Sequence, residues 1–167
     1  MRRPIAAALA ATALLGLSAP ALAQTAPAKP QIERKVNSPT AVISSSALVP
    51  PGSRTLYISG TTPSPPDPTK PEDLGDTRAQ TLSILTKMKA QLEGMGWSMG
   101  DMVKMTVFLV APTPGGRMDS AAMNDVFKTF FGTAEQPNRP TRSTIQIAAL
   151  GRPTMYVEIE GIAAKAP

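Results

Sequence analysis

The sequence of 167 residues contains neither cysteine nor histidine. Without cysteine there is no disulfide framework, no thiol nucleophile and no cysteine-bound zinc or iron–sulfur cluster. Without histidine there is no Ser-His-Asp triad, no HExxH metal site and no imidazole base. Any chemistry must therefore use the remaining carboxylate, amine, guanidinium and hydroxyl side chains, and we expect no bound metal.

The composition also excludes two broad classes of protein. Hydrophobic residues make up 42% of the chain and charged residues 17%, which is too apolar for a disordered protein. The formal charge is +5, but no run of lysine and arginine is interleaved with aromatic residues, so the footprint of a nucleic-acid-binding protein is missing. The length suits a single domain. We therefore expect one globular domain with no nucleic-acid partner.

The first 23 residues have the three-part layout of a secretory signal peptide. Arg2 and Arg3 form a basic head, an apolar stretch follows over 5–17, and Ala21-Leu22-Ala23 is a small-x-small cleavage site. A membrane anchor is the alternative, but the apolar run of about 13 residues is shorter than the roughly 20 that span a bilayer. We predict cleavage after Ala23 and a periplasmic or secreted protein without membrane contact.

Proline divides the rest of the chain. The 18 prolines are about 11% of the residues, roughly twice the usual share. Residues 24–39 are rich in alanine, proline and lysine without periodicity, which predicts a flexible lead-in to a domain over 40–167. Five prolines over 61–75 predict a long loop, which is either a surface insertion or functional.

Two segments have the spacing of amphipathic helices. In 76–94, apolar residues recur at three- and four-residue steps; they are Ala79, Leu82, Leu85 and Met88, then Leu92 and, just beyond, Met95. In 120–131, one helical face carries Met123, Val126, Phe127 and Phe130. Asp76 or Thr77 is the expected N-cap of the first helix, with Gly94 or Gly96 near its end.

Five segments have the character of β-strands. They are 40–48, 54–59, 102–110, 143–150 and 154–163. The order β-β-α-β-α-β-β predicts an α+β fold in which the two helices cover one face of a mixed sheet. Because several strands are apolar on both sides, oligomerisation is a natural way to cover the other face.

The best local candidate for chemistry is Arg142 together with Glu158. Pro140 stiffens the start of the strand that carries Arg142, which presents a fork of donors suited to a carboxylate. Glu158 lies on the polar side of the following strand, where it could place a water or move a proton next to the guanidinium. The spacing alone favours a surface cross-strand ion pair of little energetic value over a catalytic pair.

These same residues resemble a known family. The segments PTRSTIQIAAL (140–150) and VEIEGIA (157–163) are similar to the C-terminal pattern of the reactive intermediate deaminases, also called the RidA or YjgF family, with Gly161 where the pattern expects alanine. Other similar stretches are YISG (57–60), DTRAQT (76–81), VKMTVFL (103–109) and MNDVFKTFF (123–131). The resemblance covers roughly residues 36–164.

The resemblance implies a chorismate-mutase-like homotrimer with three clefts between subunits. It implies hydrolysis of enamines and imines such as 2-aminoacrylate to 2-keto acids and ammonia, with a small imino or keto acid as partner and no cofactor. An imine is already electrophilic, so the protein only has to hold the carboxylate, exclude bulk water and place one water.

The resemblance also assigns roles to individual residues. Arg142 matches the arginine that pairs with the substrate carboxylate, and Glu158 the acid that orients water or protonates the intermediate. Backbone groups near Ser143 and Thr144 match substrate contacts, and Asn124 matches a position near the subunit contact. The sequence departs from the family at 42–46, where many members carry a tyrosine that reaches the cleft and this chain reads VISSS.

Two other classes of function remain open. One is a non-catalytic trimer whose clefts hold a small carboxylate, for which Arg142 would bind ligand without turnover. The other is a chaperone-like interaction protein, suggested by nine methionines and the proline-rich loops, for which Arg142 would be dispensable.

Overall fold

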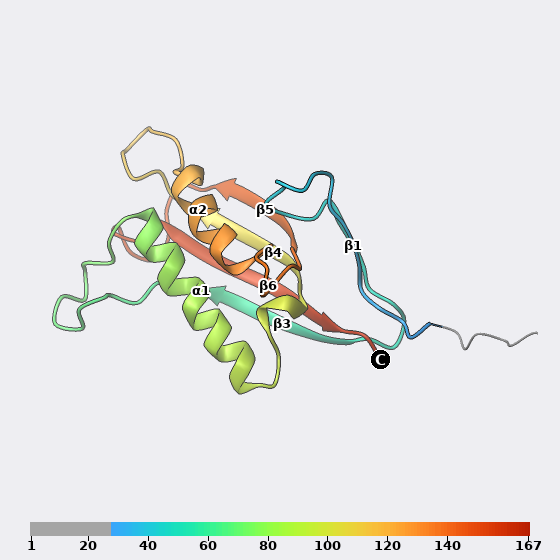
Figure 1. The fold of residues 1–167 in the computed structure, drawn as a ribbon. Helices are drawn as coiled ribbons and strands as arrows, with labels where there is room; N and C mark the ends of the chain where they lie inside the picture. Colours follow the sequence, from blue (N-terminus) through green and yellow to red (C-terminus); the bar gives the residue numbers. More distant parts are fainter. Residues whose placement is uncertain (1–27) are drawn as a thin grey trace, which may run out of the picture.

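The computed structural model describes residues 28–167 (Figure 1). Its main body is a four-stranded sheet in the order β3-β6-β4-β5. These strands are β3 (Arg54–Thr61), β6 (Val157–Lys165), β4 (Met102–Leu109) and β5 (Thr141–Gln146). Only β4 and β5 run parallel, so the sheet is mixed. The helices α1 (Thr77–Gly94) and α2 (Ser120–Phe130) cover one face (Figure 1), which confirms the predicted α+β fold.

Aspartate side chains set the start of both helices. The carboxylate of Asp76 accepts a hydrogen bond from the backbone N–H of Ala79, and Asp119 does the same for Ala122 in α2. Such caps satisfy backbone donors that the first turn of a helix leaves free. After α1, Gly96 adopts a φ of +74° and turns the chain into the short 3₁₀ helix η1 (Met99–Asp101), which leads directly into β4.

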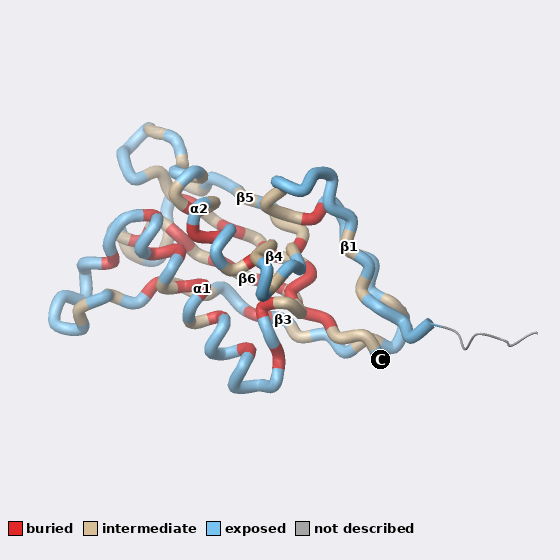
Figure 2. The backbone as a smooth tube through the Cα atoms, viewed as in Figure 1, coloured by how far each residue is buried: buried red, intermediate tan, exposed pale blue. Residues whose placement is uncertain are grey.

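The core lies between the helices and the sheet (Figure 2). Fully buried side chains from both layers meet there; they are Ile84, Leu85, Met88 and Leu92 of α1, Met123 and Phe127 of α2, and Met105, Val107 and Leu109 of β4. The helical spacing therefore predicts most of the core. Leu82 and Met95 differ from the prediction, being 49% and 53% exposed, because α1 turns Gln80 and Thr81 towards the sheet instead.

The N-terminal part of the domain differs from the prediction. Residues Glu33–Lys35, expected within the flexible lead-in, form β1, which pairs antiparallel with β2 (Ser46–Leu48) in a separate ribbon. The guanidinium of Arg34 donates to the carbonyl oxygens of Gly100 and Met102 and fixes this ribbon to the main body. Such long-range contacts leave no periodic pattern in the sequence.

Other predicted strands are shorter than expected. The predicted strand over 40–48 is reduced to its last three residues, and β5 ends at Gln146 rather than at residue 150. The predicted signal peptide over 1–23 and the first residues of the lead-in lie outside the described part of the chain. Within residues 28–167, none of the helices is both long and apolar enough for a membrane span.

Candidate functional site

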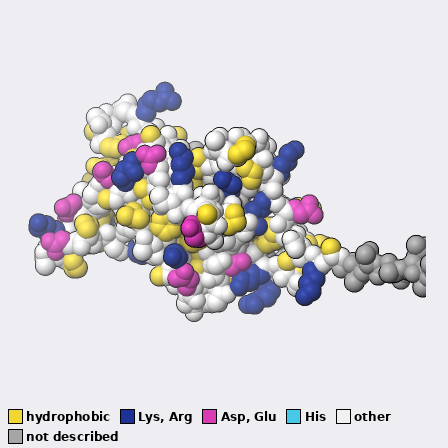
Figure 3. Space-filling model, viewed as in Figure 1, with side chains coloured by type: hydrophobic (Ala, Val, Ile, Leu, Met, Phe, Trp, Pro, Cys, Tyr) yellow, Lys and Arg dark blue, Asp and Glu magenta, His cyan; other side chains and the backbone are white. Residues whose placement is uncertain are grey.

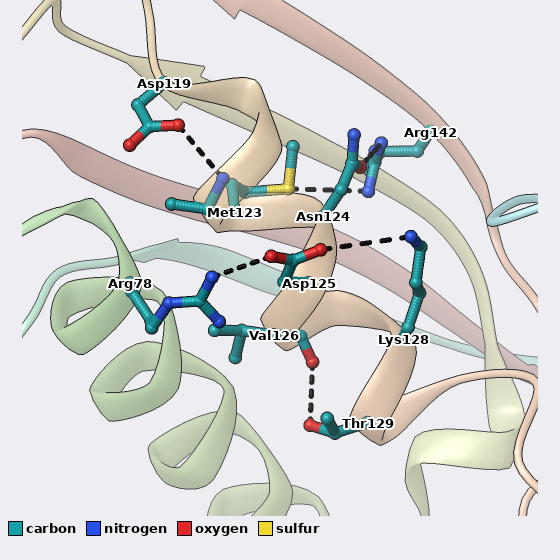
Figure 4. Close-up of polar contacts among 10 residues, drawn as sticks. Arg78, Asp119, Met123, Asn124, Asp125, Val126, Lys128, Thr129 and Arg142 are labelled. Carbon is teal, nitrogen blue, oxygen red and sulfur yellow. Dashed lines mark hydrogen bonds and ion pairs between the residues drawn. The ribbon is translucent and has the colours of Figure 1, made fainter.

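Arg142 projects from β5 towards α2, where its guanidinium contacts Met123 and Asn124 (Figure 4) and the ring of Phe127. One guanidinium nitrogen, Nη2, donates to Oδ1 of Asn124 at 2.6 Å, and Nη1 points at the sulfur of Met123 at 3.5 Å. The guanidinium carbon lies 4.4 Å from the centre of the Phe127 ring, within the range of a cation–π contact. The sequence places Met123 and Phe127 on the core face of the second helix, and the structure shows that this face also forms the floor under Arg142.

Among the described residues, the positive charge of Arg142 has no partner of opposite sign. Within residues 28–167, the ion pairs closer than 4.0 Å do not include Arg142, and its buried Nε–H has no hydrogen-bond acceptor. Burial lowers the pKa of the guanidinium to about 10, so the group still carries its charge at neutral pH. A partly buried, uncompensated cation of this kind favours binding of an anion, and a guanidinium suits a carboxylate in particular.

The start of β5 is fixed on both sides of Pro140. Thr141 donates its hydroxyl to the carbonyl of Val103 on β4 at 2.9 Å. Ser44, which is 2% exposed, bonds the carbonyls of Arg139 and Pro140 through its hydroxyl and its backbone N–H. Ser44 belongs to the segment 42–46, where many members of the RidA family carry a tyrosine. The structure thus places this segment beside the strand of Arg142, with a serine in a bracing role.

The two predicted neighbours of Arg142 lie differently. Ser143 faces away from the helices, where its hydroxyl accepts a hydrogen bond from Lys104 at 2.8 Å. Ile147 donates its N–H to Leu109 of β4, and alternate residues of a parallel strand bond to the same side. The backbone groups of Arg142 and Thr144 therefore point to the free edge of β5, the last strand of the described sheet. They are available to a ligand or to a second chain.

Glu158 lies on β6 and reaches over β3. Its carboxylate occupies the space above Gly60, where a Cβ atom would overlap it. The ladder between β3 and β6 shifts register between Ile58 and Thr61, so β3 bulges at this point and carries no side chain under the carboxylate. The predicted strand over 54–59 ends just before Gly60, and the place of Gly60 in YISG is the one signal in the sequence that marks it.

The structure corrects the expected cross-strand pair of Arg142 and Glu158. β4 lies between their strands, with Arg142 opposite Met105 and Glu158 opposite Phe108. Met105 points to the helices and Phe108 to the other face, because side chains alternate along a strand. The two candidate residues therefore leave opposite faces of the sheet within one chain. Strands consecutive in sequence are not neighbours here, which the spacing could not reveal.

Asn124 has a definite contact inside the chain. The resemblance implies a position near a subunit contact, and in the described structure its amide oxygen accepts a hydrogen bond from Arg142 at 2.6 Å. On the other side of the same helix, Asp125 pairs with Arg78 of α1 at 2.7 Å (Figure 4). Adjacent residues of α2 therefore hold the guanidinium and join the two helices.

The far face of the sheet is open in the single chain. Its side chains border a hollow of about 560 Å³, with Tyr57 at 76% exposure and Lys104, Glu160 and Ile162 around it. An open sheet face that carries large apolar side chains next to charged ones is typical of an interface between chains. The trimer expected from the resemblance would use this face, and it stays a prediction.

The fold places this chain in a class of small α+β proteins, in which two helices cover one face of a mixed four-stranded sheet. Its candidate site is an arginine without an ion-pair partner on the edge strand β5. Residues 37–165 match the model of the family described as Endoribonuclease L-PSP. The chain belongs to this family, which is the RidA/YjgF family named above and includes reactive intermediate deaminases.

Two curated relatives illustrate the similarity. A RutC family protein from Pyrococcus horikoshii is 35% identical over 111 residues, covering 66% of this chain and 79% of the relative. The 2-iminobutanoate/2-iminopropanoate deaminase of Escherichia coli is 34% identical over 101 residues, which are 60% of this chain and 73% of the enzyme.

Solved structures share the fold. A Rid family protein from Yersinia pestis, YyfB, has a TM-score of 0.62 at 26% identity, covering 79% of this chain and 98% of its own. E. coli TdcF, solved with bound serine, has a TM-score of 0.55 at 35% identity, covering 71% of this chain and 85% of its own.

Proposed function

We propose that this protein hydrolyses reactive enamines and imines of the 2-aminoacrylate type to 2-keto acids and ammonia. The uncompensated guanidinium of Arg142 carries the proposal, because a partly buried cation with an unused N–H suits a carboxylate ligand. The curated relative that acts on 2-iminobutanoate and 2-iminopropanoate supports this substrate class. The serine in TdcF supports a site for a small amino-acid-like molecule.

The proposed chemistry needs only the groups present. An enamine first takes a proton at its terminal carbon and becomes the iminium form. Water then attacks the imine carbon and loses a proton, which gives a carbinolamine. When this intermediate collapses, its hydroxyl group forms the C=O bond of the 2-keto acid and releases a proton to solvent, which balances the proton that the enamine took from solvent. The C–N bond breaks in the same step and ammonia leaves. Arg142 holds the carboxylate throughout, and Glu158 accepts the proton of the water and returns it to the leaving nitrogen.

We propose that two subunits build each site. Arg142 and Glu158 leave opposite faces of one sheet, so a single chain cannot bring them to the same substrate. A homotrimer with a cleft between neighbouring subunits would let Arg142 of one subunit face Glu158 of the next. The free edge of β5 and the open far face of the sheet are the surfaces available for this assembly.

The test uses 2-aminoacrylate generated enzymatically from serine, with pyruvate and ammonia measured over time. We expect the wild-type protein to accelerate release above the buffer rate. Arg142→Gln and Glu158→Gln should each lower the rate at least a hundredfold, while Arg78→Gln, which removes an exposed arginine 53% accessible to solvent, should stay within twofold. A wild-type rate equal to the buffer rate for several imino acids would contradict the proposal. Binding of pyruvate without turnover would favour the non-catalytic alternative.

We further propose that the protein is exported and cleaved after Ala23, as its N-terminal layout predicts. The mature protein would then begin at Gln24 in a periplasmic or culture fraction. Intact-mass measurement of the expressed protein decides this point, since retention of Met1 would contradict it.

A further inference from the structure

The guanidinium of Arg142 spends only part of its hydrogen-bonding capacity on α2. In the described chain, Nη2 donates to Oδ1 of Asn124 at 2.6 Å and Nη1 points at the sulfur of Met123 at 3.5 Å. Each of these nitrogens carries a second N–H. One N–H on each terminal nitrogen is therefore left for a ligand, which is the number that a carboxylate takes in a bidentate contact.

The helix itself gives no reason for an amide at position 124. Asn124 is the fifth residue of α2, and asparagine is a poor helix former because its side chain competes for backbone hydrogen bonds. Aspartate has a similar helix propensity and almost the same shape. The backbone would accept either side chain at this position, so the reason for the amide lies in its contact with Arg142.

The acidic side chains of the same helix are engaged elsewhere (Figure 4). Asp119 caps the N-terminus of α2, and Asp125 pairs with Arg78 and, at 3.9 Å, with Lys128. The pKa of Arg142 agrees with this arrangement, because burial lowers it and no neighbouring carboxylate raises it. The helix thus brings an acceptor to the guanidinium without bringing a negative charge.

A carboxylate in place of the amide would change the site in one respect. It would accept from Nη2 in the same geometry, but the bond would become charge-assisted and the pair would be neutral overall. A substrate carboxylate would then meet a negative charge beside the guanidinium, which is unfavourable in a partly buried place.

We propose that Asn124 is a positioning residue for the substrate: its amide fixes the guanidinium of Arg142 without neutralising it, so that the charge stays available to the substrate carboxylate. The inference rests on the part of the proposed function in which Arg142 holds a carboxylate. It gives Asn124 a role within its own subunit, through Arg142 and not through a contact with the reacting atoms.

The test combines urea unfolding with calorimetric binding of pyruvate. Asn124→Asp should raise the urea midpoint and weaken pyruvate binding at least a hundredfold, and the rate at limiting 2-aminoacrylate should fall by the same factor. Asn124→Leu, which removes the acceptor, should lower the midpoint and weaken binding about tenfold. A purely structural role predicts that affinity follows stability, so a more stable variant with the weaker binding is the distinguishing result.

Two further variants control for charge and for the partner. Gln91→Glu makes the same change from amide to carboxylate on the exposed side of α1 and should leave pyruvate affinity within twofold. In an Arg142→Gln background, Asn124→Asp should no longer raise the urea midpoint. A gain that persists there would arise from other contacts and would overturn the inference.

The outcomes separate this inference from the proposed reaction. Equal pyruvate binding by the wild type and Asn124→Asp, or equal rates at limiting 2-aminoacrylate, overturns the role of Asn124 even in an active enzyme. Pyruvate binding that is lost in Asn124→Asp, by a protein that turns over no imine, overturns the deaminase function alone. A wild-type protein that neither binds pyruvate nor turns over 2-aminoacrylate overturns both, because both need a carboxylate at Arg142.

Discussion

Arg142 is held by groups that suit its shape but not its charge. Its guanidinium contacts an amide oxygen, a thioether sulfur and an aromatic ring, and in the described chain none of the ion pairs involves it. Taking a cation out of water without an opposite charge is unfavourable. We therefore expect the free protein to be less stable than it would be with a neutral side chain at this position, and we expect an anionic ligand to offset the difference.

This argument predicts a trade-off between stability and function at Arg142. Arg142→Met keeps the length and apolar stem of the side chain and should raise the free energy of unfolding by about 1 kcal/mol, while carboxylate binding is lost. Urea unfolding at pH 7 measures the change. Arg78→Met is the control on an exposed arginine, and we expect it to change stability by less than about 0.5 kcal/mol. A less stable Arg142→Met protein would contradict the account.

Gly60 leads to a second prediction at the residue scale. A methyl group there would overlap the Glu158 carboxylate, so Gly60→Ala should displace Glu158 and leave the strand pairing in place. We expect kcat to fall at least tenfold with KM within twofold, because Arg142, not Glu158, binds the carboxylate. Gly94→Ala has open space around its Cβ and is the matched control. Equal losses in kcat for both variants would show that Gly60 has no special role.

At the scale of elements, α1 fixes the start of β6. Gln80 is fully buried, and its amide bonds the carbonyls of Gly75 and Thr154 as well as the N–H of Tyr156. One side chain thus bonds three backbone groups, two as a donor and one as an acceptor. The strand that carries Glu158 therefore depends on a helix residue 78 positions earlier in the chain.

Replacing this amide should destabilise the whole domain. Gln80→Leu preserves the volume but leaves three partly buried backbone groups without their partner, and we expect a loss of about 3 kcal/mol in the free energy of unfolding. Thr86→Ala, on the exposed side of the same helix, should change it by less than about 0.5 kcal/mol. Equilibrium unfolding in urea compares the two, and similar small effects would show that solvent replaces the bonds of Gln80.

At the scale of the whole molecule, β4 lies between the strands that carry the two candidate residues, Arg142 and Glu158.

The surface charge shows no nucleic-acid-binding pattern on the face drawn in Figure 3. Lys and Arg side chains are scattered over this face and do not gather into a stripe. That distribution gives no support to a nucleic-acid surface on this face. The separation of Arg142 and Glu158 instead makes the arrangement of subunits the decisive question for function.

A mixing experiment tests shared sites directly. Arg142→Gln and Glu158→Gln proteins, each inactive alone, are unfolded together and refolded, or co-expressed with different tags. In each mixed trimer one cleft of the three would combine an intact Arg142 from one chain with an intact Glu158 from its neighbour. In a random equal mixture this is about a quarter of all clefts, and activity should recover to about that fraction. Refolding each variant alone is the control. Mixed assemblies that stay inactive would show that the two residues do not act across subunits.

The period of the apolar residues predicts the helices, the core and four of the strands, because burial on one face imposes that period directly. It does not predict β1, which depends on the long-range contacts of Arg34, nor the exposed side of Leu82 and Met95, which depends on how α1 is rotated against the sheet. It also misses the roles of Gly60 and Gln80, because their partners are 98 and 74 to 76 residues away along the chain.

By itself the sequence determined which chemistries were impossible, which family motifs were present and which residues were candidates, since these depend on residue type and local spacing. Only the tertiary structure decided that Arg142 and Glu158 leave opposite faces of the sheet, because strand order and side-chain direction follow from pairing across the whole domain. Only the structure showed that Arg142 is a partly buried charge without a counter-ion among the described residues. Without histidine and cysteine, the candidate site depends on a guanidinium and a carboxylate. Its guanidinium, that of Arg142, is placed to bind an anion.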